Sequence, residues 1–122
     1  MQIWQKYGGL CAYCGEPIEL KQMQVDHIKP KFHNWSEKDK FALLPKNYFG
    51  DDSMENLNPS CRMCNFRKGT DTIEVFRDAI RHSLVCLERS FTYRLAKRYG
   101  LVKEIPQNVE FYFEKYEKMR RD

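Results

Sequence analysis

The chain has 122 residues, of which 42% are hydrophobic and 31% are charged, and its formal net charge is +4. This length suits a single domain, and the composition is that of a globular chain and excludes a disordered one. No apolar run approaches the roughly 20 residues that span a bilayer, and the first residues lack the basic and apolar regions of a signal peptide, so we expect a cytoplasmic protein.

The first 70 residues predict two cysteine knuckles separated by a strand and a polar loop. Gly15 follows the first knuckle, where a tight turn favours a positive φ. A strand is expected around residues 23–25, before the break at Pro30. The loop that follows is irregular, with a short helix within residues 37–44. The second knuckle leads into a helix that ends at Gly69.

The remaining residues, 71–122, predict a mainly helical extension. Asp71 and Glu74 form a capping box, and apolar residues then recur every three or four positions. This pattern predicts one amphipathic helix over residues 73–91, whose apolar stripe forms part of the core. Cys86 lies beside that stripe, so a buried or half-buried thiol is expected there.

The end of the extension predicts one more helix and a strand. Ser90 and Gly100 are expected to start and stop the helix. Residues 109–113 are β-branched and aromatic, and they predict a late strand. We expect this extension to pack on residues 1–70, so that the chain forms one compact domain.

Four of the five cysteines form two CxxC pairs, Cys11 with Cys14 and Cys61 with Cys64. Four thiolates bind Zn²⁺ tetrahedrally at about 2.3 Å and leave no open position, so the predicted ion is structural. The alternative is a redox CxxC, which normally opens a helix in a thioredoxin-like pattern that this sequence lacks. We therefore predict that a zinc ion clamps residues 1–70.

A further motif lies between and within the knuckles. It reads Asp26-His27-Ile28-Lys29-Pro30, then Asn56-Leu57, then Cys61-x-x-Cys64-Asn65-x-x-Lys68-Gly69. Over residues 8–70 the chain thereby resembles the HNH endonuclease family. The resemblance implies an α+β fold with a ββα-metal core, a β-hairpin and a helix around one catalytic metal. By position, Asp26 and Asn65 would be metal ligands, His27 the general base, and Asn56 the residue that holds the hairpin and the base.

The implied chemistry is metal-dependent hydrolysis of DNA phosphodiesters to 5′-phosphate and 3′-hydroxyl ends. A neutral imidazole takes a proton from water near pH 7, because its ordinary pKa is about 6.5. Carboxylate and amide oxygens are hard ligands that suit Mg²⁺ or Mn²⁺. Such a cation acts as Lewis acid and template.

Basic residues indicate where DNA would bind. Arg62, Arg67 and Lys68 lie in a stretch without acids, and we predict that they contact phosphates. A second acid-free run, residues 89–103, carries Arg94, Lys97 and Arg98 among its cations. These residues either follow a DNA backbone or face solvent.

Other polar residues and other functions remain open on the sequence alone. His33 is expected on the surface, with a second base or extra ligand as the alternative, and Asp51 and Asp52 are expected in a solvated loop, with a metal contact as theirs. The rival function is a catalytically silent, zinc-stabilised DNA-binding module. A nuclease toxin that travels on another partner is a third reading. A homodimer, or a larger phage or restriction machinery, would be the protein partner.

Overall fold

A computed structural model describes residues 2–31 and 49–121, and for residue 121 only the backbone. The fold is α+β, as predicted: a small two-stranded sheet is surrounded by helices. In chain order the elements are α1 (Gln2–Gln5), η1 (Leu20–Gln22), β1 (Gln24–His27), η2 (Met54–Asn56), β2 (Leu57–Ser60), α3 (Arg62–Lys68), α4 (Ile73–Arg81), α5 (Ser83–Leu87), α6 (Phe91–Arg98) and α7 (Tyr112–Arg121).

The sheet consists of β1 and β2 in antiparallel pairing. Asp26 lies opposite Asn58, and His27 lies opposite Leu57. Cys61 follows β2 directly and is the N-cap residue of α3, so strand, strand and helix follow one another with only the long β1–η2 connection intervening. This order places the start of α3 beside the start of β1, and Lys68 at the end of α3 reaches Asp26 and His27 at the end of β1.

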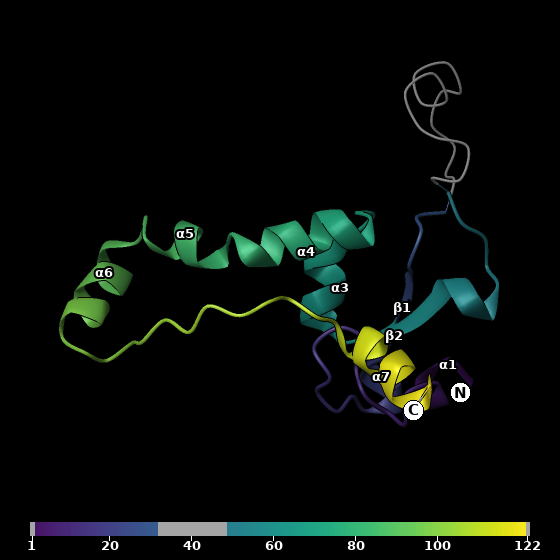
Figure 1. Ribbon diagram of the computed structural model, residues 1–122. Helices are drawn as coiled ribbons and strands as arrows, with labels where there is room; N and C mark the ends of the chain where they lie inside the picture. Colours follow the sequence, from purple (N-terminus) through teal and green to yellow (C-terminus); the bar gives the residue numbers. More distant parts are fainter. Residues whose placement is uncertain (1, 32–48, 122) are drawn as a thin grey trace, which may run out of the picture.

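The core is an aromatic cluster built on the first knuckle. The Tyr13 ring meets the Phe76 ring of α4 edge to face, with the ring centroids 5.5 Å apart, and it meets the Phe111 ring at 5.3 Å. Tyr7 meets Tyr116 of α7 at 5.1 Å, and Figure 1 shows α7 beside α1. Aromatic pairs in this geometry add to the stabilisation that burial provides. The N-terminal knuckle, α4 and α7 are therefore held together by one set of rings.

The predicted strand over residues 109–113 is wrong. Residues 102–111 have no regular secondary structure, and α7 begins at Tyr112. The backbone N–H groups of Tyr112 and Phe113 donate to the Tyr13 and Ala12 carbonyls at 3.1 and 2.8 Å, so the segment follows the knuckle instead of a strand partner. The Glu114 carboxylate accepts from the Phe111 N–H at 2.9 Å and thereby favours a helix start.

The single helix predicted over residues 73–91 is divided. α4 ends at Arg81, and His82 separates it from α5. Ser90 is the N-cap of α6, as predicted, and its hydroxyl accepts from the Tyr93 N–H. Only the first part of the apolar stripe reaches the core: Phe76 is 2% exposed, whereas Phe91 is 71% exposed. In Figure 1 the green helices α5 and α6 extend away from the sheet. Neither has a buried residue.

Several local expectations can be compared with the structure. Gly15 and Gly69 adopt φ values of +79° and +53°, in the turn and at the helix end where glycine was expected. The N-cap of α4 is Thr72 and not Asp71, because the Thr72 hydroxyl accepts from the Val75 N–H at 3.3 Å. Cys86 is exposed, not half-buried. His33 and the helix predicted within residues 37–44 lie outside the described residues.

Candidate metal centre and histidine site

The four predicted cysteines gather at one point. The Sγ atoms of Cys11, Cys14, Cys61 and Cys64 all lie within 4.8 Å of one another. The Cys14 and Cys61 sulfurs are 3.8 Å apart. Four sulfurs placed tetrahedrally at about 2.3 Å from a zinc ion are roughly 3.8 Å apart, so the cluster has the size of a zinc site. It could hold a metal ion such as zinc.

Backbone N–H groups point at the sulfurs and prepare them to carry negative charge. The Tyr13 and Cys61 N–H groups donate to the Cys11 sulfur at 3.4 and 3.3 Å, and the Cys64 N–H donates to the Cys61 sulfur at 3.4 Å. The last of these bonds is also the N-cap of α3. The turn of each knuckle therefore positions both its two thiols and the donors that stabilise them.

The pKa values of the thiols in the cluster shift in opposite directions. A hydrogen bond from the Cys64 thiol lowers the pKa of Cys11 to about 4. Burial raises the pKa of Cys14 to about 11, and the hydrogen bond to Cys11 raises the pKa of Cys64 further. Four thiolates this close are stable together only around a cation, since their mutual repulsion is otherwise uncompensated. The donor set thus fits a divalent metal that prefers sulfur.

Asp26 of the predicted catalytic pair is buried, with 3% of its surface exposed. Its carboxylate accepts from the Tyr13 hydroxyl and from the Lys68 ammonium, whose nitrogen lies 3.2 and 3.1 Å from the two carboxylate oxygens. Burial raises the pKa of the Asp26 carboxyl, and the Tyr13 and Lys68 contacts oppose this shift. The pair joins β1 to α3 and to the first knuckle.

Lys68 is not placed to contact phosphate, contrary to our expectation. Its side chain is completely buried, and its ammonium also donates to the His27 carbonyl at 2.9 Å. The reason is the helical phase of α3: successive residues turn by about 100°, so Cys64, Asn65 and Lys68 share the inward face. Arg62 and Arg67 fall on the opposite, exposed face.

The exposed face of α3 is basic and apolar together. Met63 and Phe66 lie between the two arginines around the helix, and they are 76% and 88% exposed. Within the part of the chain that the structure describes, neither Arg62 nor Arg67 has an acidic partner. Both remain available to phosphate.

Asn65 is half-buried on the inward face of α3. Its backbone N–H and carbonyl belong to the helix and its cap, with the Gly69 N–H donating to its carbonyl at 2.9 Å. No hydrogen bond to its side-chain amide occurs among residues 2–31 and 49–121. The amide is the one member of the predicted cation ligand pair that is not already engaged.

The structure does not fit Mg²⁺ or Mn²⁺ at Asp26 as the side chains are arranged. A hard cation needs a free carboxylate oxygen. Both oxygens of Asp26 already accept hydrogen bonds, and a neighbouring ammonium would repel a second cation. Occupation by a divalent ion requires Lys68 to leave.

His27 ends β1 and is partly open to solvent. Its Nε2 lies 2.8 Å from Oδ1 of Asp52, and Lys31 donates to the other oxygen of Asp52 at 2.6 Å. Hydrogen bonds from Lys31 and then His27 lower the pKa of the exposed Asp52 carboxyl. We expected Asp52 in a solvated loop, and its contact with the histidine was missed. The Asp51-Asp52 pair was visible in the sequence. Its position relative to β1 was not, because that depends on the register of the loop.

Asn56 fixes the geometry around His27. Its side-chain oxygen accepts from the Lys29 N–H at 2.8 Å, and its amide nitrogen donates to the Lys29 and Asp51 carbonyls at 3.1 and 2.7 Å. Its own carbonyl accepts from the Ile28 N–H at 2.8 Å. One buried side chain therefore ties the chain after β1 to the chain before η2.

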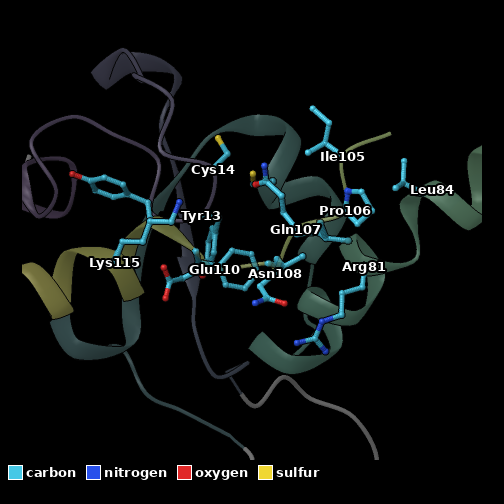
Figure 2. A pocket seen from close by; sticks show the side chains of 15 residues that line it. Tyr13, Cys14, Arg81, Leu84, Ile105, Pro106, Gln107, Asn108, Glu110 and Lys115 are labelled. Atoms are coloured by element: carbon cyan, nitrogen blue, oxygen red, sulfur yellow. The ribbon is translucent and has the colours of Figure 1, made fainter. Parts of the chain in front are cut away.

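A cavity of about 560 Å³ lies beside the cysteine cluster. Cys14 and Cys64 are part of its wall, and Figure 2 shows Leu84 near Ile105 and Pro106, which also line it. Its lining includes neither Asp26 nor His27, so the cavity is not the histidine site.

Comparison with known proteins adds no assignment. The chain matches no protein-family model, and no curated protein is similar to it. Among the described residues, no helix has the length and apolar character that crossing a membrane would require.

Proposed function

We propose that the chain is a zinc-clamped DNA endonuclease of the HNH type, with His27 as the general base. The observation that supports the proposal is the placement of His27. It lies at the end of β1, partly exposed, beside a carboxylate and braced through Asn56, with α3 following β2 directly. The strand–strand–helix order and these residues correspond to the ββα arrangement that the sequence motif implies.

In this proposal the imidazole of His27 takes a proton from the water that attacks phosphorus. The exposed arginines of α3, Arg62 and Arg67, bind the phosphate backbone, where they add affinity without reading the sequence. A Zn²⁺ ion in the cysteine cluster has a structural role, because four thiolates leave no position for water or substrate.

The sequence motif also implies Mg²⁺ or Mn²⁺ between Asp26 and Asn65. The carboxylate of Asp26 is occupied by Lys68 and Tyr13, which is the observation that favours the rival function, a DNA-binding module without catalysis. One experimental result distinguishes the two functions. The module binds DNA and does not cut it in any metal, whereas the nuclease cuts.

The test is to incubate supercoiled plasmid with the purified protein, with and without Mn²⁺. One site per chain cuts one strand at a time, so we expect nicked circles before linear DNA. His27→Ala should lose cleavage and keep DNA binding. His82→Ala is the matched control, since His82 is exposed between α4 and α5 and its ring hydrogen-bonds only to the Asp78 carbonyl among the described residues. Equal cleavage by His27→Ala and the wild type would remove His27 from the reaction.

A further inference from the structure

The chain segment that carries Asp52 is locked in place without help from the Asp52 side chain. Asn56 donates to the Asp51 carbonyl at 2.7 Å, and the Gly50 N–H donates to the Pro30 carbonyl at 3.0 Å. On the other side, Asp51 accepts from the N–H and hydroxyl of Ser53 at 3.0 and 2.6 Å. The position of residue 52 relative to His27 is therefore set by contacts of the neighbouring residues and not by the Asp52 side chain.

Gly50 makes this lock possible. A Cβ atom at this position would lie 2.8 Å from Cγ of Asn56, which is closer than real Cβ contacts allow. The glycine thus lets the Asn56 amide reach across to the Asp51 carbonyl. The brace and the carboxylate that it positions are parts of one device.

The chemistry of the Asp52–His27 contact decides which histidine nitrogen carries the proton. An ionised carboxylate only accepts hydrogen bonds, so Nε2 must be the N–H that donates across the 2.8 Å contact. In a neutral imidazole the other nitrogen, Nδ1, then carries the lone pair. Among the residues that the structure describes, nothing hydrogen-bonds to Nδ1 of His27.

We propose that Asp52 is the positioning residue of His27, and that it holds the imidazole in the Nε2–H form so that Nδ1 is the proton-accepting atom. The proposal rests on the nuclease function proposed above. In the reaction, Nδ1 takes a proton from water and the water oxygen bonds to phosphorus. The bond from phosphorus to the 3′ oxygen breaks, and the leaving oxygen takes its proton from solvent. Asp52 stabilises the imidazolium that forms, as a carboxylate does in other histidine-based sites.

The exposure of the pair sets the size of the expected effect. The Asp52 side chain is 60% exposed and that of His27 30%, so solvent screens their interaction. We therefore expect Asp52→Ala to lower kcat by about 10-fold with little change in KM, a smaller loss than in buried triads. Asp52→Asn keeps an accepting oxygen and should lose less.

The direct test is the tautomer of His27, read from the ¹⁵N shifts of its imidazole in the full-length, zinc-loaded protein above pH 8. Wild type should show mainly the Nε2–H form, and Asp52→Ala should shift the population toward Nδ1–H. Glu55→Gln is the matched control. Glu55 is an exposed acid of η2, three residues from Asp52, and its side chain has no hydrogen bond among the described residues, so neither the tautomer nor kcat should change.

The outcomes separate this proposal from the nuclease function. If the wild type cleaves DNA and Asp52→Ala has an unchanged tautomer or unchanged kcat, Asp52 is not a positioning residue and the nuclease function stands. If the wild type does not cleave but only Asp52→Ala changes the tautomer, the contact is real and the nuclease function fails. A change of equal size in Glu55→Gln would overturn the assignment to Asp52.

Discussion

At the scale of single residues, the most consequential contact is the buried pair of Lys68 and Asp26. It is completed by the Tyr13 hydroxyl, and Asn58 donates to that same hydroxyl at 3.5 Å. Burying both charges costs free energy, which good geometry and additional hydrogen bonds offset. The pair therefore specifies how α3 sits on β1 more than it adds net stability.

Removal of one partner of this pair should be strongly destabilising. We expect Lys68→Met to lower the free energy of unfolding by about 3–5 kcal/mol, because Asp26 would remain buried and unpaired. Denaturant unfolding of the zinc-loaded protein measures the change. Lys97→Met is the control: Lys97 pairs with Glu88 and Glu104 on the surface, where solvent screens the charges, so its loss should change the stability little.

The double variant Asp26→Leu/Lys68→Met keeps this prediction decidable if the single variant does not fold. Replacing both partners by apolar residues removes the unpaired charge, so the double variant should be more stable than Lys68→Met alone. A double variant as unstable as the single one would show that the pair is not the source of the loss.

At the scale of elements, Arg77 of α4 joins that helix to α7. Its guanidinium binds the Glu114 carboxylate through two nitrogens, at 2.9 and 2.7 Å, and donates to the Val109 carbonyl at 2.6 Å. It also lies over the Phe111 ring, 5.0 Å from the centroid. This contact holds the returning C-terminal segment against α4.

The Arg77–Glu114 contact predicts a dependence of stability on pH. Hydrogen bonds from Arg77 lower the pKa of Glu114 from its ordinary value of 4.5. The folded state therefore keeps the carboxylate ionised where the unfolded state protonates it, so the stabilisation is present above pH 4.5 and is lost as pH falls through the lower folded pKa. Unfolding free energies from pH 7 to pH 3 should fall less steeply for Glu114→Gln than for wild type.

The control for that measurement is Glu110→Gln, since Glu110 pairs with the exposed Lys118. Its pH profile should follow that of the wild type. Parallel profiles for Glu114→Gln and wild type would contradict the stabilising role of the Arg77 contact.

The arm formed by α5 and α6 predicts uneven local stability. Neither helix buries a residue. Phe91, the first residue of α6, and Leu101, which follows that helix, are both exposed. Local opening is easiest where few apolar contacts are buried. Amide hydrogen exchange should therefore be faster in α5 and α6 than in β2 and α3, measured on the same zinc-loaded sample. Protection in α6 equal to that in α3 would contradict this.

At the scale of the whole molecule, the cysteine cluster lies between the first knuckle and α3, and we propose that a zinc ion bound there clamps the two together. We expect about one zinc ion per chain by metal analysis. Structural zinc provides roughly 10–16 kcal/mol in small zinc peptides, which equals or exceeds the stability of a typical domain. Chelation should therefore abolish cooperative thermal unfolding, and Cys61→Ser should reproduce this result.

Cys86→Ser is the matched control for the clamp. Cys86 is an exposed thiol on α5, outside the cluster. Its replacement should change neither the zinc content nor the unfolding transition. If zinc-free protein unfolds cooperatively at the same temperature as the untreated sample, the cluster does not clamp the chain.

The sequence predicted well what depends on spacing along the chain. Two CxxC pairs indicated the cluster, and the glycines that end the knuckle and α3 were found because few other residues adopt a positive φ. Each of these features depends on a few neighbouring residues, which a pattern can capture. The α+β class, in contrast, was implied by the resemblance of residues 8–70 to a known family.

What depends on tertiary contacts was not predictable in the same way. We predicted that Lys68 contacts phosphate. Its burial could not be foreseen, because it depends on which face of α3 turns toward Asp26. Residues 109–113 have strand-like composition, yet a strand needs a partner and this segment finds the Tyr13 backbone instead. The contact between Asp52 and His27 depends on a loop register that no periodicity encodes.

The two-faced character of α3 limits how this region can change over evolutionary time. A residue inserted between Cys64 and Lys68 would rotate everything after it by about 100° and carry the lysine away from Asp26. The number of residues in this helix is therefore fixed, whereas the residue types at the outward positions of Met63 and Phe66 can vary. Homologous chains, when aligned, should show substitutions on that side and no gaps.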